Sequence, residues 1–213
     1  MAIIYPLDLV RGKTFSLPIR WQEKEIFVAK AISGISTATG FPRLTVPSHG
    51  VPQGWNIAVF GVAAPKQVNA KNNPPRDADY TKATVVDANT IELNLVIPVD
   101  DNGRDWAAYT SGGFVIYRQP RPLSGATARV KIKDRVGGTV LLSTEIDDAP
   151  NNLISATVDD TNKSITVEIS ASVTQALSWG KGVWEVEVES SAGKVDSLIA
   201  PSPVVVGDEV VTP

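Results

Sequence analysis

The sequence contains no cysteine and a single histidine, His49. Without cysteine the chain can form no disulfide, no thiolate metal site and no cysteine nucleophile. Histidine is the commonest general base near neutral pH, so a serine–histidine–aspartate triad would have to use His49. That residue lies in the turn-rich segment 47–54, which predicts a turn histidine whose ring is hydrogen-bonded locally. We therefore expect no enzymatic activity, no catalytic residue, no bound metal and no cofactor.

Long apolar runs and a strong excess of one charge are also absent. No run of about 18 apolar residues occurs, so we expect no membrane-spanning segment and no membrane partner. The net charge of −3 and the pI near 5.2 give no electrostatic footprint for nucleic acid. The first residues have no basic region and no long apolar stretch, so no secretory signal is expected. The lack of cysteine is compatible with assembly in a reducing cytoplasm.

Alternation of apolar and polar residues is the main pattern that is present, and it predicts strands. In segment 13–21 the apolar residues on one face include Trp21, while Pro18 lies on the other face and indicates an edge strand or a bulge. Segment 126–133 alternates strictly, with charged residues facing outward, and Gly137-Gly138 then turns the chain. Further strands are predicted over residues 26–32, 44–46, 56–62, 81–86, 90–96, 113–117, 139–143, 164–170, 184–189, 195–199 and 204–206.

One short helix interrupts the strands, over residues 170–180. It begins with serine caps and ends at Gly180. Val173, Ala176 and Leu177 fall at helical spacing and are predicted to close one end of a sandwich. Regular short strands separated by turns predict an all-β fold, a β-sandwich or a barrel.

Two segments flank a middle region whose residue pattern differs from that of the strands before and after it. Segments 22–25 and 119–122 are predicted to be linkers, and glycine and proline punctuate the region between them. The amphipathic strand 13–21 cannot bury its face alone. We therefore predict a discontinuous sandwich made of residues 1–25 and 120–213, with residues 26–119 inserted as a small β-barrel. Two consecutive domains remain the alternative.

The outer segments resemble a module of tailed bacteriophages. Segment 125–134, the strand 164–170 followed by residues 174–180, and the hairpin 183–195 are similar to the immunoglobulin-like N-terminal domain of phage upper-baseplate proteins. Segment 10–15 is similar to the strand that precedes this repeat in that family. The resemblance covers about half of the chain, and it implies a discontinuous immunoglobulin-like β-sandwich.

The middle region resembles a second module that occurs in phage tail-associated proteins. Segments 48–54, 59–62 and 108–113 are similar to the small β-barrel known as the FCCH domain of ubiquitin-activating enzymes. This barrel is an accessory domain, so the resemblance implies no ubiquitin chemistry. Residues 68–71 depart from the usual pattern, and residues 72–79 lengthen the loop that follows.

Three acidic pairs are candidates for chemistry: Asp100-Asp101, Asp147-Asp148 and Asp159-Asp160. Paired carboxylates serve as glycosidase acids or calcium ligands. Each pair also lies beside asparagine or glycine in a predicted turn, where aspartate bonds its own backbone. The turn interpretation is therefore favoured, and segment 101–105 lacks the closing glutamate of an EF-hand loop.

Tryptophans offer candidate binding positions. Trp21 and Trp184 follow inward strand registers, which predicts core packing. Trp55 and Trp106, with Tyr109, lie beside loops of the middle region. If exposed, they would be possible contacts for a neighbouring subunit or a glycan, with core packing as the alternative.

These observations predict a non-enzymatic structural protein of a tailed-phage virion, assembled in the host cytoplasm. It would mediate protein–protein contacts in the tail, baseplate or neck. Its expected partners are other virion structural proteins and further copies of itself in a symmetric array. A capsid decoration protein and a receptor- or carbohydrate-binding module are the alternatives.

Overall fold

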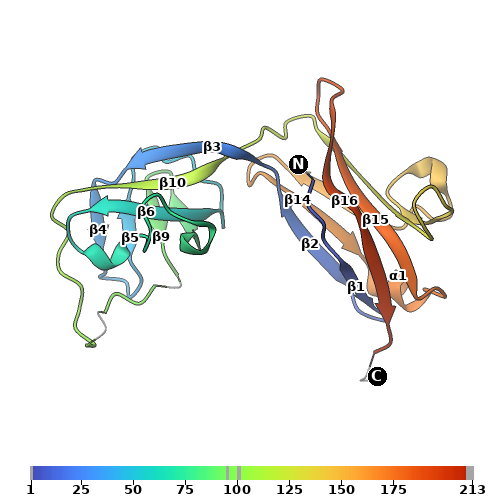
Figure 1. The fold of residues 1–213 in the computed structure, drawn as a ribbon, viewed down its shortest axis with the longest axis horizontal. Coiled ribbons are helices and arrows are strands. Elements are labelled where there is room, and N and C mark those ends of the chain that lie inside the picture. The colour runs from blue at the N-terminus through green and yellow to red at the C-terminus, as the bar shows by residue number, and fades with distance from the viewer. Residues whose placement is uncertain (1, 95, 100–101, 210–213) are drawn as a thin grey trace. The chain divides into compact units, whose positions relative to one another are not determined.

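The computed structural model describes residues 2–94, 96–99 and 102–209 (Figure 1). The chain is all-β, with several sheets, and it divides into two compact units. Unit 1 consists of Met1–Trp21 together with Arg121–Pro213, and unit 2 consists of Gln22–Pro120. Over these residues no helix has the length and apolar character that crossing a membrane requires.

Unit 1 contains two sheets. The first has the strand order β1-β16-β15-β11-β12, and the second has the order β13-β14-β2. The strands of unit 1 are β1 (Leu7–Val10), β2 (Phe15–Arg20), β11 (Thr127–Lys133), β12 (Val140–Ser143), β13 (Ser155–Asp159), β14 (Ser164–Ile169), β15 (Lys181–Glu189) and β16 (Val195–Gly207). All neighbouring pairs are antiparallel except β1 and β16, which run parallel. Pro18 lies within β2 at the end of the second sheet, so the predicted edge strand is confirmed.

Both sheets of unit 1 bury their apolar faces in one core. The predicted alternation is confirmed on β11 and β15, where Val130, Ile132 and Trp184 are buried. The second sheet adds Val167 and Ile169 from β14, and three partly buried residues of β2 pack against the same core. A smaller cluster contains Trp21, Leu123, Ile165 and Val188. The hydrophobic residues of the two sheets therefore stabilise one another.

The short helix of unit 1 is confirmed, but it is shorter than the segment 170–180. Helix α1 spans Ala171–Gln175, and the Ser170 hydroxyl accepts a hydrogen bond from the Val173 amide. Leu177 is buried, and Val173 packs against the core from its edge. The Thr174 hydroxyl donates to the Lys13 carbonyl, which ties α1 to the segment before β2.

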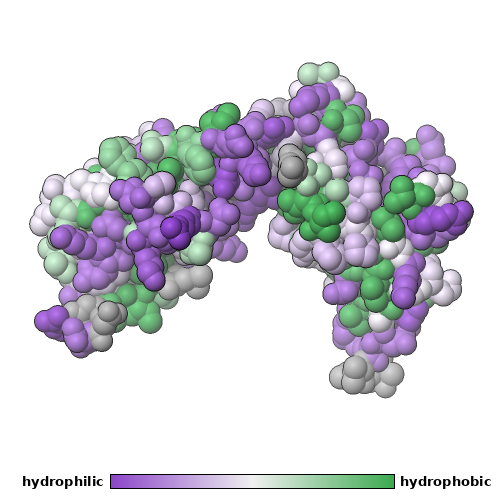
Figure 2. Space-filling model, in the orientation of Figure 1, coloured by the Kyte–Doolittle hydropathy of each residue, from purple (hydrophilic) through white to green (hydrophobic). Residues whose placement is uncertain are grey.

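The outer face of the β11–β15 pair carries opposite charges in register. Arg129 lies opposite Glu187, and Lys131 lies opposite Glu185. A guanidinium nitrogen of Arg129 is 3.2 Å from a carboxylate oxygen of Glu187. Lys131 Nζ lies 2.8 Å from Asp148 Oδ2. On the face that Figure 2 shows, much of the surface is hydrophilic, and hydrophobic residues gather at a few places.

Unit 2 also contains two sheets, with the orders β3-β10-β6-β7 and β4-β5-β9-β8. Its strands are β3 (Gln22–Ala31), β4 (Gly34–Ser36), β5 (Arg43–Thr45), β6 (Asn56–Val62), β7 (Thr81–Lys82), β8 (Thr84–Asp87), β9 (Thr90–Glu92) and β10 (Gly112–Pro120). Short 3-10 turns occur at Lys66–Val68 and Asp77–Asp79. Unit 1 has a further 3-10 turn at Ile146–Asp148.

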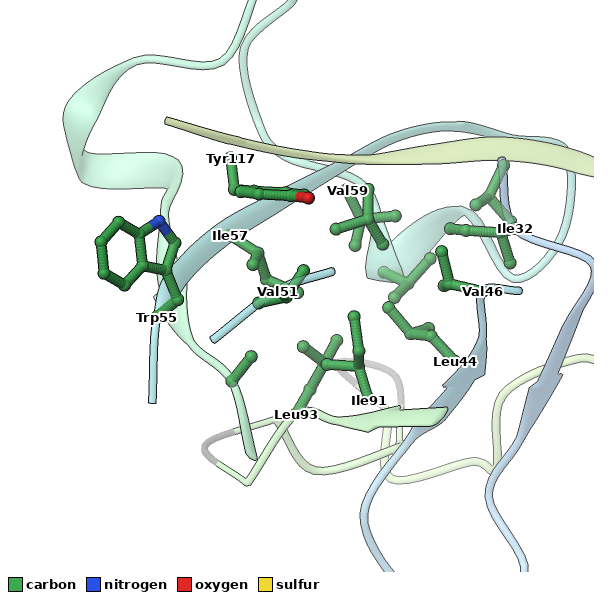
Figure 3. Packing of buried hydrophobic residues seen from close by; sticks show 14 of the residues in the cluster. Ile32, Leu44, Val46, Val51, Trp55, Ile57, Val59, Ile91, Leu93 and Tyr117 are labelled. Carbon is green, nitrogen blue, oxygen red and sulfur yellow. The ribbon is translucent and has the colours of Figure 1, made fainter. Parts of the chain in front are cut away.

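The core of unit 2 is assembled from both of its sheets (Figure 3). Trp55, Leu44, Ile57 and Ile91 have no exposed surface. Other buried members are Ile32, Val46, Val51, Val59, Val62, Val68, Ala83, Leu93, Trp106, Val115 and Tyr117. This core contains no residue of unit 1, so each unit has a hydrophobic core of its own.

Several elements differ from the sequence predictions. Segment 81–86 is not one strand, because the Ala83 amide donates to the Trp55 carbonyl and the chain passes from one sheet to the other there. Strands β1 and β13 were not predicted, and neither was the short β4. The predicted segments 195–199 and 204–206 are parts of a single strand, β16.

The predicted linkers are wrong for residues 22–25, 119 and 120, because these residues belong to strands. Residues 22–25 open strand β3, and β10 continues to Pro120, which lies opposite Gln22. Immediately beyond this pair, the Arg121 amide donates to the Trp21 carbonyl at 3.0 Å. The units therefore divide at Trp21/Gln22 and Pro120/Arg121, whereas the sequence placed the divisions after residues 25 and 119. The two ends of unit 2 lie side by side.

Candidate interaction surface

His49 is a buried bridge between backbone segments. His49 is 2% exposed. The Val51 amide donates to Nδ1 at 2.9 Å, so Nδ1 carries no proton, and Nε2 donates to the Asp87 carbonyl at 2.8 Å. The Tyr117 hydroxyl donates to the His49 carbonyl, and burial raises the pKa of that phenol. The predicted local ring bond is confirmed, and a long-range bond to Asp87 accompanies it.

Replacing His49 should destabilise unit 2. His49→Ala leaves the Val51 amide and the Asp87 carbonyl without their partner, and we expect a loss of about 2–4 kcal/mol in the free energy of unfolding. His49→Asn provides a control, because the Asn side-chain oxygen can accept from the Val51 amide and should retain part of this stability. Urea unfolding measures both variants. Equal stability of wild type and His49→Ala would contradict the bridging role.

The acidic pair Asp159-Asp160 is held by hydrogen bonds within and next to a turn. Asp159 Oδ1 accepts from the amides of Thr161 and Asn162. Asp160 Oδ1 accepts from the Leu123 amide and from Lys163 Nζ. The turn interpretation is confirmed for this pair. Asp148 belongs to the Ile146–Asp148 turn and pairs with Lys131.

No group of three or more possible metal ligands lies together among residues 2–94, 96–99 and 102–209. The pair Asp100-Asp101 lies outside the described residues.

Hydrogen bonds lower the pKa of several of these carboxyl groups. The Asn162 amide lowers the pKa of Asp159, the Lys163 side chain lowers that of Asp160, and the Lys131 side chain lowers that of Asp148. In unit 2 the Arg76 amide lowers the pKa of Asp79, and the Asn89 amide lowers that of Asp87. Each of these groups binds a proton more weakly in the folded chain than in the unfolded chain.

Acid should therefore destabilise both units. A carboxyl group with a lowered folded-state pKa contributes stability above its unfolded pKa, near 3.8 here, and that stability is lost as the pH falls through the folded value. We expect the urea midpoint to fall progressively between about pH 5 and about pH 2. Asp159→Asn should reduce this pH dependence for unit 1. A urea midpoint that stays constant over this pH range would contradict the stabilising role of these carboxylates.

Trp55 and Trp106 are buried, so the condition for a partner contact through them is not met. Trp55 has 0% exposure, and its indole nitrogen donates to the Arg118 carbonyl at 3.0 Å (Figure 3). Trp106 is 9% exposed, and its indole nitrogen donates to the Val99 carbonyl. Tyr109 packs against the same core and donates its hydroxyl to the carbonyls of Ile32 and Gly112. Core packing therefore describes these three side chains. The indole nitrogens of the two tryptophans and the hydroxyl of Tyr109 each donate to a backbone carbonyl.

The structure places a different set of aromatic residues at the surface of unit 2. Residues opposite one another on β3, β10 and β6 project to the same side of the sheet. Phe114 lies opposite Ala31 on β3 and Phe60 on β6, and Ile116 lies opposite Ala29 and Ala58. Because Val115 and Tyr117 point into the core, these residues point away from it. We name this outer side, formed by Phe27, Ala29, Ala31, Ala58, Phe60, Phe114 and Ile116, the phenylalanine face.

The phenylalanine face is partly exposed and internally ordered. Phe60 and Phe114 stack with ring centroids 5.5 Å apart, and Phe27 and Phe114 are each 43% exposed. The Arg118 guanidinium lies 4.9 Å from the centroid of the Phe27 ring and pairs with Asp77. Figure 2 shows hydrophobic residues on the surface along β3. An exposed apolar surface with charged groups at its margin is typical of a protein–protein contact.

The sequence carried a signal for this face. Residues 26–29, 57–60 and 114–117 are continuous apolar runs rather than alternating ones. Such runs are typical of strands that are covered on both faces. In unit 2 the described core lies on one side of this sheet, and on the other side Ala58 is 1% exposed whereas Phe27 and Phe114 are each 43% exposed.

The fold and the phenylalanine face define an all-β chain of two units with an apolar sheet surface. Comparison with protein-family models and with curated proteins found no match to this sequence.

Proposed function

We propose that this chain is a non-enzymatic structural protein of a tailed-phage virion, which mediates protein–protein contacts in the tail, baseplate or neck. Unit 1 is proposed to be an immunoglobulin-like β-sandwich. In that fold the C, F and G strands form one sheet, and B, E and D belong to the other. The assignment of β11, β15 and β16 to C, F and G, and of β2, β14 and β13 to B, E and D, agrees with the strand orders of unit 1.

Other features of unit 1 agree with this proposal. Strand β12 takes the place of C′, which extends the sheet of C, F and G in variable-type domains. The disulfide between B and F of antibody domains cannot form without cysteine. Trp184 on β15 fills the core between the sheets instead. Unit 2 then follows strand B and precedes strand C, at a loop of the sandwich.

Unit 2 is proposed to be an inserted small β-barrel. Two short sheets surround a single core, and Ala83 carries the chain from one sheet to the other. Asn69 extends the pairing at the end of β6. Its side-chain nitrogen donates to the Val62 carbonyl, and its side-chain oxygen accepts from the Val62 amide, both at 2.9 Å. This pairing imitates a strand neighbour at the end of β6. It supports the barrel at the position where the sequence departs from the FCCH pattern.

The phenylalanine face is the observation that carries the role in protein–protein contacts. Apolar side chains on the outer side of a sheet cost solubility unless another surface covers them. A partner that covers Phe27, Phe60 and Phe114 would bury aromatic side chains, the residues that contribute most to interfaces. The resemblance of the outer segments to baseplate proteins directs the proposal to the phage tail.

The composition of purified particles tests this proposal. Mass spectrometry of purified particles of the phage that encodes this chain should detect the chain in stoichiometric amounts. Immunogold labelling should place it at the tail, baseplate or neck. Labelling on the capsid would favour a decoration protein. Absence of the chain from the particles, together with binding to a glycan array, would replace the proposal with the carbohydrate-binding alternative.

A further inference from the structure

We propose that Asn102 is a site of spontaneous covalent modification, at which the backbone nitrogen of Gly103 displaces the side-chain nitrogen of Asn102 as ammonia. The product is a chain that carries aspartate or isoaspartate at position 102, with one additional negative charge. This inference concerns an exposed turn of unit 2, and it does not depend on the proposed role in a virion.

The turn that carries this pair is anchored at its base and exposed at its tip. Val99 and Asp105 form an antiparallel bridge across the base of the turn. The Trp106 indole nitrogen donates to the Val99 carbonyl at 3.2 Å, and Trp106 belongs to the core of unit 2. Asn102 and Gly103 are both exposed, so the pair lies outside the packed part of the unit.

Gly103 provides the space and the conformational freedom that the attack requires. Apart from its two neighbours in the chain, no atom lies within 4 Å of the position that a Cβ would occupy on this residue, and its φ is +74°. A β-carbon here would crowd the approach of the backbone nitrogen to the side-chain carbonyl carbon of Asn102, and glycine has none. Glycine also adopts negative and positive φ about equally readily, so rotation of the turn can bring these two atoms together.

The residue that follows selects Asn102 among the asparagines of the chain. Asn102 is the only asparagine in the sequence that precedes a glycine. Asn69 and Asn162 precede residues that carry a β-carbon, and their side chains are hydrogen-bonded to Val62 and to Asp159 respectively. Attack at either of these positions would meet a crowded nitrogen and would break those hydrogen bonds, so we expect the modification at Asn102.

The reaction needs no molecule besides the chain and water. The Gly103 nitrogen forms a bond to Cγ of Asn102, and the bond between Cγ and the side-chain nitrogen breaks. That nitrogen leaves as ammonia with the proton of the Gly103 amide, and a cyclic imide remains. Water then opens the ring: cleavage at Cγ gives aspartate, and cleavage at the backbone carbonyl carbon gives isoaspartate. No atom is oxidised or reduced.

Incubation of the purified full chain at mildly alkaline pH tests the proposal, because base removes the amide proton of the attacking nitrogen. Trypsin cleaves after Lys82 and Arg104, so one peptide carries Asn89, Asn94 and Asn102 and contains its own controls. In mass spectrometry this peptide should gain the mass difference between a hydroxyl and an amino group, and fragmentation should locate the change at position 102. Both aspartate and isoaspartate should be found there.

Variants of the two residues separate this chemistry from general hydrolysis. Gly103→Ala places a β-carbon beside the attacking nitrogen, and we expect the modification to become slower by on the order of tenfold. Asn102→Gln should abolish it, because the longer side chain would have to close a larger ring. Asn102→Asp provides the reference for charge, and its melting transitions should equal those of the wild type because exposed substitutions change stability little.

Three results would overturn the inference: an unchanged peptide after prolonged incubation of the folded chain, a change at Asn89 or Asn94 as fast as that at Asn102, or equal rates in wild type and Gly103→Ala. Aspartate without isoaspartate at position 102 would also contradict attack by the Gly103 nitrogen, because direct hydrolysis of the side-chain amide by water gives aspartate alone.

Discussion

Deletion of residues 1–21 is expected to unfold unit 1 and to leave unit 2 folded. The deleted segment contains β1 and β2, which pair with β16 and β14. It removes Leu7 and Leu9, each 1% exposed, and Trp21, which is 8% exposed. Three partly buried side chains of β2 are lost with them: Phe15, Leu17 and Ile19.

The expected loss exceeds what a domain of this size can withstand. Full burial of one large apolar side chain is worth about 1.5–3 kcal/mol, and the whole stability of a domain is about 5–15 kcal/mol. The deletion also exposes an apolar side of both sheets of unit 1. Circular dichroism melts should therefore show one transition lost and one retained, with the unit 2 transition as the internal control.

Excision of Gln22–Pro120 is the matched experiment. The Arg121 amide and the Trp21 carbonyl are already hydrogen-bonded, so a short Gly/Ser turn can replace unit 2 with little strain and a small loop-closure entropy. We expect the excised chain to melt cooperatively. The consecutive-domain alternative predicts the reverse, namely that residues 121–213 fold without the N-terminal segment. A cooperative melt of residues 121–213 alone would exclude the discontinuous unit.

Trp184→Ala is expected to have the largest effect of any single substitution considered for unit 1. Trp184 is 1% exposed, meets Tyr5 and Phe15 edge to face, and donates its indole N–H to the Tyr5 carbonyl at 2.8 Å. Removal of a buried tryptophan costs about 3–5 kcal/mol through lost contacts and the cavity that remains. That amount is a large fraction of the stability of a domain.

Trp184→Phe provides the graded control for this prediction. Phenylalanine retains most of the ring contacts but cannot donate to the Tyr5 carbonyl, so the loss should be smaller, about 1–2 kcal/mol. Urea unfolding monitored by near-ultraviolet circular dichroism measures both variants. A Trp184→Ala protein with the stability of the wild type would mean that the two sheets do not depend on this ring.

Much of the secondary structure was predictable because its signal is local. The alternation around Val130, Ile132 and Trp184 shows which side of each strand is buried, and Ser170 caps the start of the helix as predicted. Strand β1 was missed because it has four residues and its partner, β16, begins 188 positions after Leu7, at Val195. No local pattern specifies a partner at that distance.

The candidate surface was predicted poorly for a related reason. Composition identified aromatic residues near loops, but burial depends on packing between distant segments. Trp55 lies in the core because the Arg118 carbonyl, 63 residues away in sequence, accepts its indole N–H. Phe60 and Phe114 form a surface only because β6 and β10 are neighbours in one sheet.

The sequence by itself determined that the chain is rich in strands and that it lacks cysteine chemistry. It also determined that His49 lies in a turn, where its ring is hydrogen-bonded locally. These properties depend on residue type and on spacing of a few positions. Only the tertiary structure decided that residues 22–25 belong to a long edge strand, that Trp55 is buried, and that Phe27 and Phe114 are exposed on the outer side of the sheet β3-β10-β6. The physical reason is that solvent exposure is a property of the assembled sheets, since it depends on which distant strands become neighbours.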